Sequence, residues 1–254
     1  MLQADNKKHG ILRVGTSNIV LPGNKMSFPP AFQKSSRLTY YSSLFNTVEV
    51  NSSFYKVPLP RTLERWCSEV SRDFQFTIKL WKNITHTKLL DYNPQEVDFF
   101  MQTIRHLDNK KGCLLIQLPG KISVVYFEQV CRLLLHIQRC NLAPKWRVCI
   151  EFRHDSWYSN QTWKQIADLQ VWPVLHDMPA AALRMLPYET PVVYLRFHGV
   201  LGDYKGSYSK KTLDGFADQI ARWLAAGKDV YAYFNNTMGS AFDNAQYLNS
   251  RFMA

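Results

Sequence analysis

Apolar and polar side chains alternate along most of the short β-forming runs of this chain. In the run 192–198, Val193, Leu195 and Phe197 alternate with polar or aromatic hydroxyl-bearing residues, and runs 47–51, 147–153 and 230–235 behave similarly. Successive side chains of a strand point to opposite faces, so each such strand has an apolar face and a polar face. The fold must therefore cover one face of its sheet with helices and give the other face polar surroundings.

The runs are spaced along the chain as strands that alternate with helices. Eight strands are predicted, at 11–15, 47–51, 74–80, 113–118, 147–152, 171–175, 192–198 and 230–235. Apolar residues at helical spacing predict helices between most of them, most clearly in 96–107, 127–137 and 212–226, whereas the segments before the second and seventh strands are weakly helical. Such alternation implies parallel strands joined by right-handed crossovers. Eight units in 254 residues predict a single-domain (β/α)₈ TIM barrel over 11–254, with some short or irregular helices, after a flexible N-terminus at 1–10.

In such a barrel the polar strand faces point inward, and many of their residues lie near the C-terminal strand ends, where barrel enzymes place their sites. The residues collected there are Glu49, Asn51, Lys79, Gln117, Glu151, Arg153, Arg196, His198 and Asn235. Burying an unpaired charge costs several kcal/mol, so these groups must pair with one another or with a ligand. Two interpretations stay open: a ligand site, and a self-satisfied ion network that pairs the carboxylates Glu49 and Glu151 with Lys79, Arg153 and Arg196. We favour the ligand site, because so many charges at the barrel mouth are costly as architecture alone.

Several segments of the chain resemble the YecE-like family, known as domain of unknown function 72. The resemblance rests on Phe45–Tyr55, Ile84–His86, Gln117–Pro119, Glu151–Trp157, Tyr194–Gly199, Tyr231–Asn236 and Asn244–Ala245. It spans nearly the whole chain and implies a barrel of this topology without an established reaction. Family members commonly continue the first strand as Gly-Thr-Ser-Gly-Trp, whereas Gly15-Thr16-Ser17 here leads into Asn18-Ile19-Val20.

The collected residues suggest acid–base chemistry. Glu49 and Glu151 form a candidate carboxylate pair, and His198 or His176 would supply a group that titrates near neutrality; Glu49, Glu151 and His198 are the candidate catalytic residues. Glu49, Glu151 and His198, with His176 and Asp177, are also metal-ligand types. The positive charges of Lys79, Arg153 and Arg196 would crowd that metal, so we predict none; the cofactor is left unassigned.

An anion site is the better supported interpretation. Barrels often hold phosphate between the loops after strands seven and eight, and the backbone amides of Gly239 and Ser240 could cradle it with Arg196 and Lys205. Alternatively, Ser240 caps a helix and Asn236 shapes a turn. The predicted ligand-binding residues are Asn51, Tyr55, Lys79, Gln117, Arg153, Asp177, Arg196, Asn235 and Asn236. Candidate aromatic platforms for a base or sugar are Tyr55, Trp157, Tyr204 and Tyr208.

Composition sets limits on partners and compartment. Thirty-one Lys and Arg against twenty Asp and Glu give a net charge of +11, which attracts nucleic acid and phosphates. A generally solvated basic surface is nevertheless the favoured interpretation of this charge. No apolar stretch approaches the roughly 18 residues of a membrane span, and the N-terminus lacks the apolar region of a signal peptide. Five cysteines without CxxC spacing indicate reduced thiols and a cytoplasmic protein.

The favoured function is binding of a phosphate-bearing ligand in a charged pocket at the barrel mouth, by a hydrolase or nuclease-like enzyme. The ligand would be a nucleotide, a nucleic-acid end or a sugar phosphate. Two alternatives remain: a sugar or sugar-phosphate isomerase or lyase, and a non-catalytic nucleic-acid-binding protein. The sequence decides neither between enzyme and binding protein nor the oligomeric state.

Overall fold

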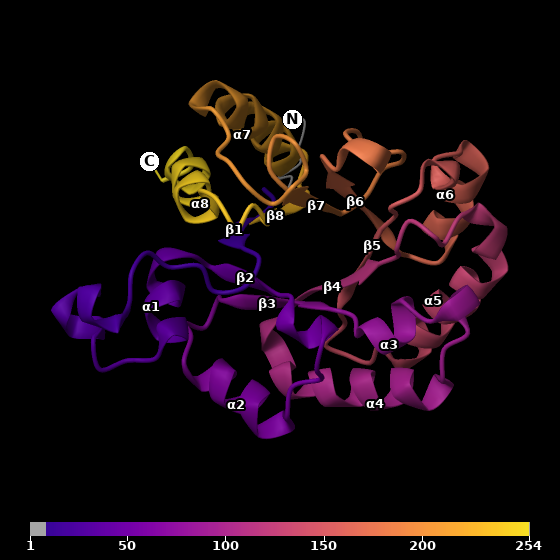
Figure 1. Ribbon diagram of the computed structural model, residues 1–254, viewed down its shortest axis with the longest axis horizontal. Coiled ribbons are helices and arrows are strands. Elements are labelled where there is room, and N and C mark those ends of the chain that lie inside the picture. The colour runs from indigo at the N-terminus through magenta and orange to yellow at the C-terminus, as the bar shows by residue number, and fades with distance from the viewer. Residues whose placement is uncertain (1–8, 254) are drawn as a thin grey trace, which may run out of the picture.

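The computed structural model describes residues 9–253 and forms an eight-stranded parallel barrel surrounded by helices (Figure 1). The strands are β1 (Leu12–Thr16), β2 (Thr47–Val50), β3 (Gln75–Lys79), β4 (Lys111–Gln117), β5 (Arg147–Glu151), β6 (Trp172–His176), β7 (Val192–Phe197) and β8 (Asp229–Phe234). The helices are α1 (Arg37–Leu44), α2 (Pro60–Ser68), α3 (Lys82–Thr85), α4 (Pro94–Ile104), α5 (Phe127–Cys140), α6 (Asn160–Asp168), α7 (Lys210–Ala225) and α8 (Ala241–Ser250). All eight predicted strands and the predicted TIM-barrel fold are confirmed. The predicted flexible segment 1–10 lies outside the described residues except for His9 and Gly10.

The strands pair in the order β1-β8-β7-β6-β5-β4-β3-β2, which leaves β1 and β2 to close the barrel. They meet through a single parallel bridge between Ser17 and Glu49. Toward the start of β1, side-chain hydrogen bonds replace the backbone pairing along this β1–β2 seam. The amide of Asn46 accepts from the Val14 backbone N–H at 3.2 Å and donates to the Leu12 carbonyl. The barrel is therefore nearly closed, and Glu49 lies where its last two strands converge.

Glycine is required at one position of this seam. A Cβ on Gly15 would lie 2.3 Å from the Thr47 carbonyl oxygen, which is far inside van der Waals contact. Strand β1 can therefore approach β2 only because residue 15 has no side chain.

Local signals position the helices. Serine hydroxyls accept from the backbone N–H three residues later at the starts of α1, α6 and α7, with Ser36, Ser159 and Ser209 as the caps. Prolines occupy the first turn of α2 and α4. After α7, Gly227 adopts a positive φ of 82° and ends the helix, as its position in the sequence predicted.

The weakly helical segments are indeed the irregular ones. Helix α1 is short, and the connection from β6 to β7 contains only a 3-10 turn at Pro179–Ala181. Figure 1 shows α7 and α6 on either side of this connection. A largely apolar cavity of about 470 Å³ lies beside it, against the helix side of β6 and β7, with Leu175, Leu195 and Trp223 in its wall.

The period-two alternation of the strands divides the interior into two packed regions. The apolar strand faces join the helices in one large core that includes Val193, Leu195 and Phe197. Inside the barrel, a smaller cluster consists of Cys113, Leu115, Cys149, Val174, Val192, Tyr194, Tyr231 and Tyr233. The charged residues lie beyond this cluster toward the C-terminal strand ends. Among residues 9–253, no helix combines the length and apolar content needed to span a bilayer.

Candidate functional site

A bidentate ion pair between Arg196 and Glu49 lies at the base of the strand-end site. Arg196, one residue before the end of β7, donates from Nε to Glu49 Oε2 at 2.9 Å and from Nη2 to Oε1 at 2.8 Å. Ser17 Oγ donates to Oε1 at 2.6 Å, and the Tyr194 hydroxyl donates to Oε2. Glu49 and Arg196 are both buried. Burial alone would raise the pKa of Glu49, but Arg196 and these hydrogen bonds outweigh it and lower the pKa.

Glu151, at the end of β5, continues the network on the other side of Arg196. Its Oε2 accepts from Arg196 Nη1 at 2.7 Å, and its Oε1 accepts from Arg153 Nε. Burial would raise the pKa of Glu151, yet the two guanidinium groups hold it well below the ordinary carboxyl value. Arg196 is thus fixed between two buried carboxylates, and burial of its own charge is offset by both of them.

Arg153 links this network to a histidine–aspartate pair. Its Nη2 lies 3.1 Å from His198 Nε2, and a guanidinium can only donate, so Nε2 accepts and the proton lies on Nδ1. His198 Nδ1 then donates to Asp177 Oδ1 at 3.2 Å, and the Tyr208 hydroxyl donates to Oδ2. Burial lowers the pKa of His198 despite Asp177, so His198 is neutral near pH 7.

His176, at the end of β6, is held by the loops around it. Its Nε2 donates to the Phe152 carbonyl at 3.1 Å and lies 3.2 Å from the Tyr158 hydroxyl, which itself donates to the Ala181 carbonyl. Burial lowers the pKa of His176 to about 4. Its buried Nδ1 has no hydrogen-bond partner among the described residues. His176 therefore stays neutral near pH 7, and its hydrogen bonds hold the loop after β5 against the end of β6.

Lys79, at the end of β3, differs from the other cations. Its Nζ donates to the side-chain oxygen of Gln117 at 2.9 Å and lies 4.2 Å from the centroid of the Phe54 ring. No carboxylate oxygen within residues 9–253 lies at ion-pair distance from it. Burial, and then the charge of Arg196, lower its pKa to about 8. Lys79 is thus a half-buried amine without a carboxylate at ion-pair distance, and Glu151 and Glu49 raise its pKa only from farther away.

His86 lies on the same side of the site, after α3. Its ring contacts Phe54 edge-on with 4.8 Å between centroids. Burial lowers its pKa to about 4, with further lowering by the charges of Lys79, Lys121 and Arg153. Positive potential therefore accumulates around Lys79, Arg153 and His86, on the solvent side of the buried ion pairs.

The structure places the remaining predicted ligand-binding residues around this network, with different roles. Asn51 has a buried Oδ1 without a partner among the described residues. Tyr55 is 68% exposed, and Lys82 Nζ lies 5.7 Å from the centroid of its ring. Asn235 is buried directly after β8, and the amide of Asn236 donates to the Gly206 carbonyl at 3.0 Å. Asn236 thus joins the loops after β7 and β8.

The predicted phosphate cradle at Gly239 and Ser240 is wrong. The Gly239 N–H donates to the Asn236 carbonyl at 2.9 Å, and the Ser240 N–H donates to the Gly206 carbonyl at 3.0 Å. Both amides are therefore used by the chain, because the glycine-containing loop after β7 folds back against the loop after β8. Ser240 precedes α8 without a side-chain capping hydrogen bond, so the alternative capping role is also not realised.

Two of the predicted aromatic platforms belong to the core. Trp157 is fully buried, donates from Nε1 to the Ile122 carbonyl at 2.7 Å and stacks on Phe152 at 4.3 Å. Tyr208 is buried and bonded to Asp177. Tyr204 remains partly accessible with its ring 5.8 Å from that of His198. Only Tyr55 and Tyr204 stay available for stacking.

Sequence reasoning missed the two hydroxyls that complete the Glu49 site, Ser17 and Tyr194. Tyr194 lies two residues before Arg196 on the same strand face, so the period-two pattern contained the signal. Ser17 carried no comparable signal, because its contact with Glu49 depends on the closure of β1 against β2. With both oxygens of Glu49 saturated by four donors, this carboxylate is committed to holding Arg196.

The sequence and the fold both match known proteins. The model of the family described as "Protein of unknown function DUF72" matches residues 13–254. The UPF0759 protein YunF of Bacillus subtilis is 24% identical over 253 residues, a match that covers 87% of this chain and 88% of YunF. The UPF0759 protein YecE of Escherichia coli is 32% identical over 83 residues, which is 33% of this chain and 30% of YecE.

Solved structures agree on the fold. A DUF72 family protein from Enterococcus faecalis superposes with a TM-score of 0.75 at 21% identity, covering 97% of this chain and 99% of its own. A DUF72 family protein from Thermotoga maritima superposes with a TM-score of 0.72 at 21% identity, covering 96% of this chain and 100% of its own. The structural likeness therefore covers nearly all of the chain and supports the barrel fold.

Proposed function

The chain belongs to the DUF72 family of proteins of unknown function, as the resemblance of its motifs predicted, and we propose that it binds a phosphate-bearing ligand at the C-terminal strand ends. The direct contacts are Lys79 and Arg153. Glu151, Arg196 and Glu49 lie beneath them and position Arg153. The ligand class comprises nucleotides, nucleic-acid ends and sugar phosphates, which share a dianionic phosphate.

The unpaired charge of Lys79 carries this proposal. An ammonium removed from water without a carboxylate partner costs free energy, which is expressed in its pKa of about 8. A phosphate beside Nζ would supply the missing negative charge and restore the pKa toward its ordinary value. Arg153 supports the same placement, because its side chain is 13% exposed and its Nη1 is free of protein bonds among the described residues. A guanidinium binds phosphate oxygens well.

This assignment changes the roles predicted from sequence. Arg196 was a predicted ligand contact, but its three nitrogens already donate to Glu49 and Glu151. Glu49 was a predicted catalytic residue, but it is buried and saturated. Within this proposal both act as positioning residues. Each carboxylate oxygen of Glu151 accepts only one hydrogen bond from the chain, so it could accept another from a ligand. Glu151 and His198 therefore remain the candidates for proton transfer to or from a bound ligand.

Thermal unfolding with added anions tests the proposal. Millimolar phosphate should raise the melting temperature more than sulfate or chloride at equal ionic strength, since a ligand that binds only the folded state stabilises it by mass action. Ribose 5-phosphate, AMP and a 5′-phosphorylated oligonucleotide, each compared with its unphosphorylated form, would then rank the three ligand sources.

Matched variants locate the effect. K79Q and R153Q should each lose the phosphate-specific gain, whereas K164Q, which removes the same charge from the exposed face of α6, should retain it. A gain that is equal for all three anions, or that survives in both K79Q and R153Q, would overturn the proposal.

A second candidate function rests on the Lys79 amine itself. With a pKa of about 8, a useful fraction of it is uncharged at neutral pH, as an imine-forming lysine requires. Its nitrogen would add to the carbonyl carbon of a sugar or sugar phosphate, and the carbonyl oxygen would leave as water. This favours the isomerase or lyase alternative.

Borohydride trapping separates the two candidates. Reduction in the presence of a ketose or aldose phosphate should add the mass of the reduced sugar to the peptide that contains Lys79, and K79R should abolish the adduct. K111R, at the opposite end of the barrel, is the control. An adduct spread over surface lysines, or none at all, would reject imine chemistry and leave phosphate binding as the sole candidate.

A further inference from the structure

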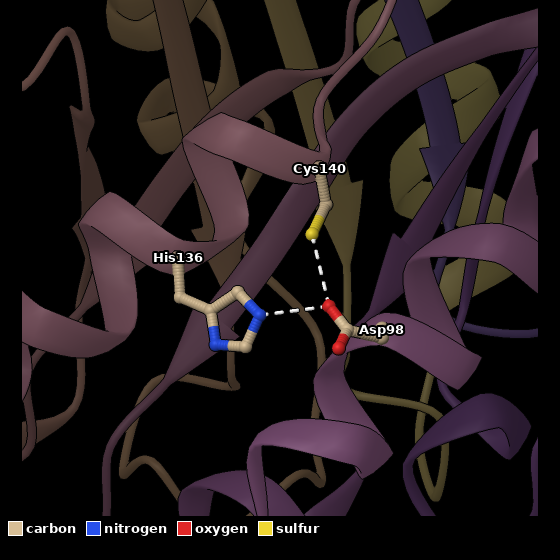
Figure 2. A group of neighbouring side chains, drawn as sticks. All are labelled: Asp98, His136 and Cys140. Carbon is tan, nitrogen blue, oxygen red and sulfur yellow. Dashed lines mark hydrogen bonds and ion pairs between the residues drawn. The ribbon is translucent and has the colours of Figure 1, made fainter.

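Asp98, His136 and Cys140 form a compact cluster between α4 and α5, away from the strand ends (Figure 2). Asp98 Oδ1 lies 2.8 Å from His136 Nε2 and 3.3 Å from Cys140 Sγ. The three donor atoms all lie within 4.8 Å of one another. The carboxylate comes from α4, and the imidazole and thiol come from one face of α5, because residues four apart on a helix are neighbours.

The spacing of these atoms is close to that of a tetrahedral metal site. Zinc binds imidazole nitrogen and carboxylate oxygen at about 2.0–2.2 Å and thiolate sulfur at about 2.3 Å, which puts neighbouring ligand atoms about 3.4–3.6 Å apart. The nitrogen–oxygen distance would have to widen from 2.8 Å by about 0.6 Å and the sulfur–oxygen distance from 3.3 Å by about 0.3 Å. The nitrogen–sulfur distance, which is at most 4.8 Å, would have to close toward about 3.6 Å. Changes of that size are within reach of side-chain rotation.

We propose that Asp98, His136 and Cys140 bind a thiophilic divalent cation, with Zn²⁺ as the best fit, and that water takes the fourth position. A mixed sulfur, nitrogen and oxygen set favours zinc over Mg²⁺ or Ca²⁺, which prefer oxygen alone. The His136 side chain is 22% exposed and that of Asp98 is 59% exposed, so an ion and its water can enter. The bound ion links α4 to α5 and is independent of the phosphate site.

Binding balances in charge and protons. The Cys140 thiol releases one proton to solvent and forms a metal–sulfur bond. The proton with which His136 Nε2 contacts Asp98 leaves to solvent, Nδ1 takes one up from solvent, and the neutral ring coordinates through the Nε2 lone pair. The hydrogen bonds of Asp98 to both residues break and are replaced by a metal–oxygen bond. One thiolate, one carboxylate and one dication give a neutral site.

The same three residue types also occur in cysteine nucleophile sites, but the order here is different. In a nucleophile site the imidazole contacts the thiol and the acid orients the imidazole. Here the carboxylate lies between the two, as Figure 2 shows, and no hydrogen bond joins His136 to Cys140. The geometry thus fits a shared ligand better than an activated thiol.

Cobalt substitution tests the proposal on the full chain, purified without a histidine tag, reduced and treated with chelator. One equivalent of Co²⁺ should give the visible bands of a tetrahedral ion and a sulfur-to-cobalt charge-transfer band, and Zn²⁺ should displace both. C140S should lose the charge-transfer band. H136A and D98N should each weaken binding more than about tenfold, the lower end of what even an outer-shell partner contributes.

Two matched controls identify the ligands. C131S removes another half-buried thiol from α5, and H106A removes another histidine paired with a carboxylate, Glu64; both should bind Co²⁺ as the wild type does. Zn²⁺ should also raise the melting temperature of the wild type and of C131S, but not of C140S. Absence of the charge-transfer band in the wild type, its persistence in C140S, or an equal loss in C131S would overturn the proposal.

Discussion

The two ends of the barrel hold their cations in different ways. At the N-terminal end, Arg147 pairs with Asp229 at 3.0 Å, where both side chains are a quarter to a third exposed, and its guanidinium lies over the Tyr231 ring at 5.6 Å. At the C-terminal end, Arg196 lies between two carboxylates and all three side chains are at most 1% exposed. Arg147 thus forms a partly exposed ion pair at one end of the barrel, whereas Arg196 links two buried carboxylates at the other.

The lysines of the two ends differ more than these arginines do. Lys110, before β4, donates to the Arg72 carbonyl at 2.7 Å and to Ser71, and Lys228, before β8, donates to the Thr190 carbonyl at 2.9 Å and to Glu189. Their ammonium groups are satisfied by carbonyls or a carboxylate of the chain. Lys79 has one amide oxygen and an aromatic ring. Lys110 and Lys228 thus stabilise the fold, whereas the cost of burying the Lys79 charge would be offset by binding of an anion.

The arginines give the largest expected difference. R196M strands two buried carboxylates and should lower the free energy of unfolding by about 3–5 kcal/mol, whereas R147M breaks a partly exposed pair and should cost about 1 kcal/mol or less. Urea unfolding of the two variants measures the difference. Equal decreases in the free energy of unfolding would mean that the Arg196 network contributes no more to stability than the Arg147–Asp229 pair.

Lys79 should be unfavourable for stability in the absence of ligand. K79M should raise the free energy of unfolding at pH 7 by about 2–3 kcal/mol, because it removes a half-buried charge whose pKa is lowered from 10.5 to about 8. Below pH 8 both folded and unfolded chains carry the proton and the folded chain bears the full cost. The gain should shrink as pH rises from about 8 to 10.5. K110M removes a satisfied lysine, so denaturation should show a loss instead; a loss in K79M as well would contradict the distinction.

Acidification should weaken the C-terminal end in a defined window. Burial lowers the pKa of His176 from 6.5 to about 4, so the unfolded chain takes up this proton first as pH falls. The stability that neutral His176 contributes is present above about pH 6.5 and is lost progressively toward pH 4. In H176N the free energy of unfolding should fall by about 1–2 kcal/mol less between pH 6.5 and 4 than it does in the wild type. Unfolding curves of the variant and the wild type that run parallel between pH 6.5 and 4 would contradict this.

Period-two alternation was enough to predict the barrel and the meeting of Glu49, Glu151 and Arg196, because it fixes which side chains enter the interior. The alternative of a self-satisfied network paired Glu49 and Glu151 with Arg153 and Arg196, as the structure does, but it also included Lys79. Lys79 instead contacts Gln117, because the distances that decide such pairs are defined only by the closed barrel. The Gly239 and Ser240 amides were misassigned because their acceptors belong to other loop residues, Asn236 and Gly206. Loop contacts of this kind leave no periodic signal.

The most direct test of the central claim is the pKa of Lys79, measured by NMR through the Cε carbon of labelled lysine and assigned with K79R. A half-buried amine without a counter-charge should titrate near pH 8, and saturating phosphate should move its pKa upward toward 10.5. A pKa near 10.5 without ligand, or a value near 8 that phosphate leaves unchanged, would contradict the proposal that Lys79 is held ready for an anion.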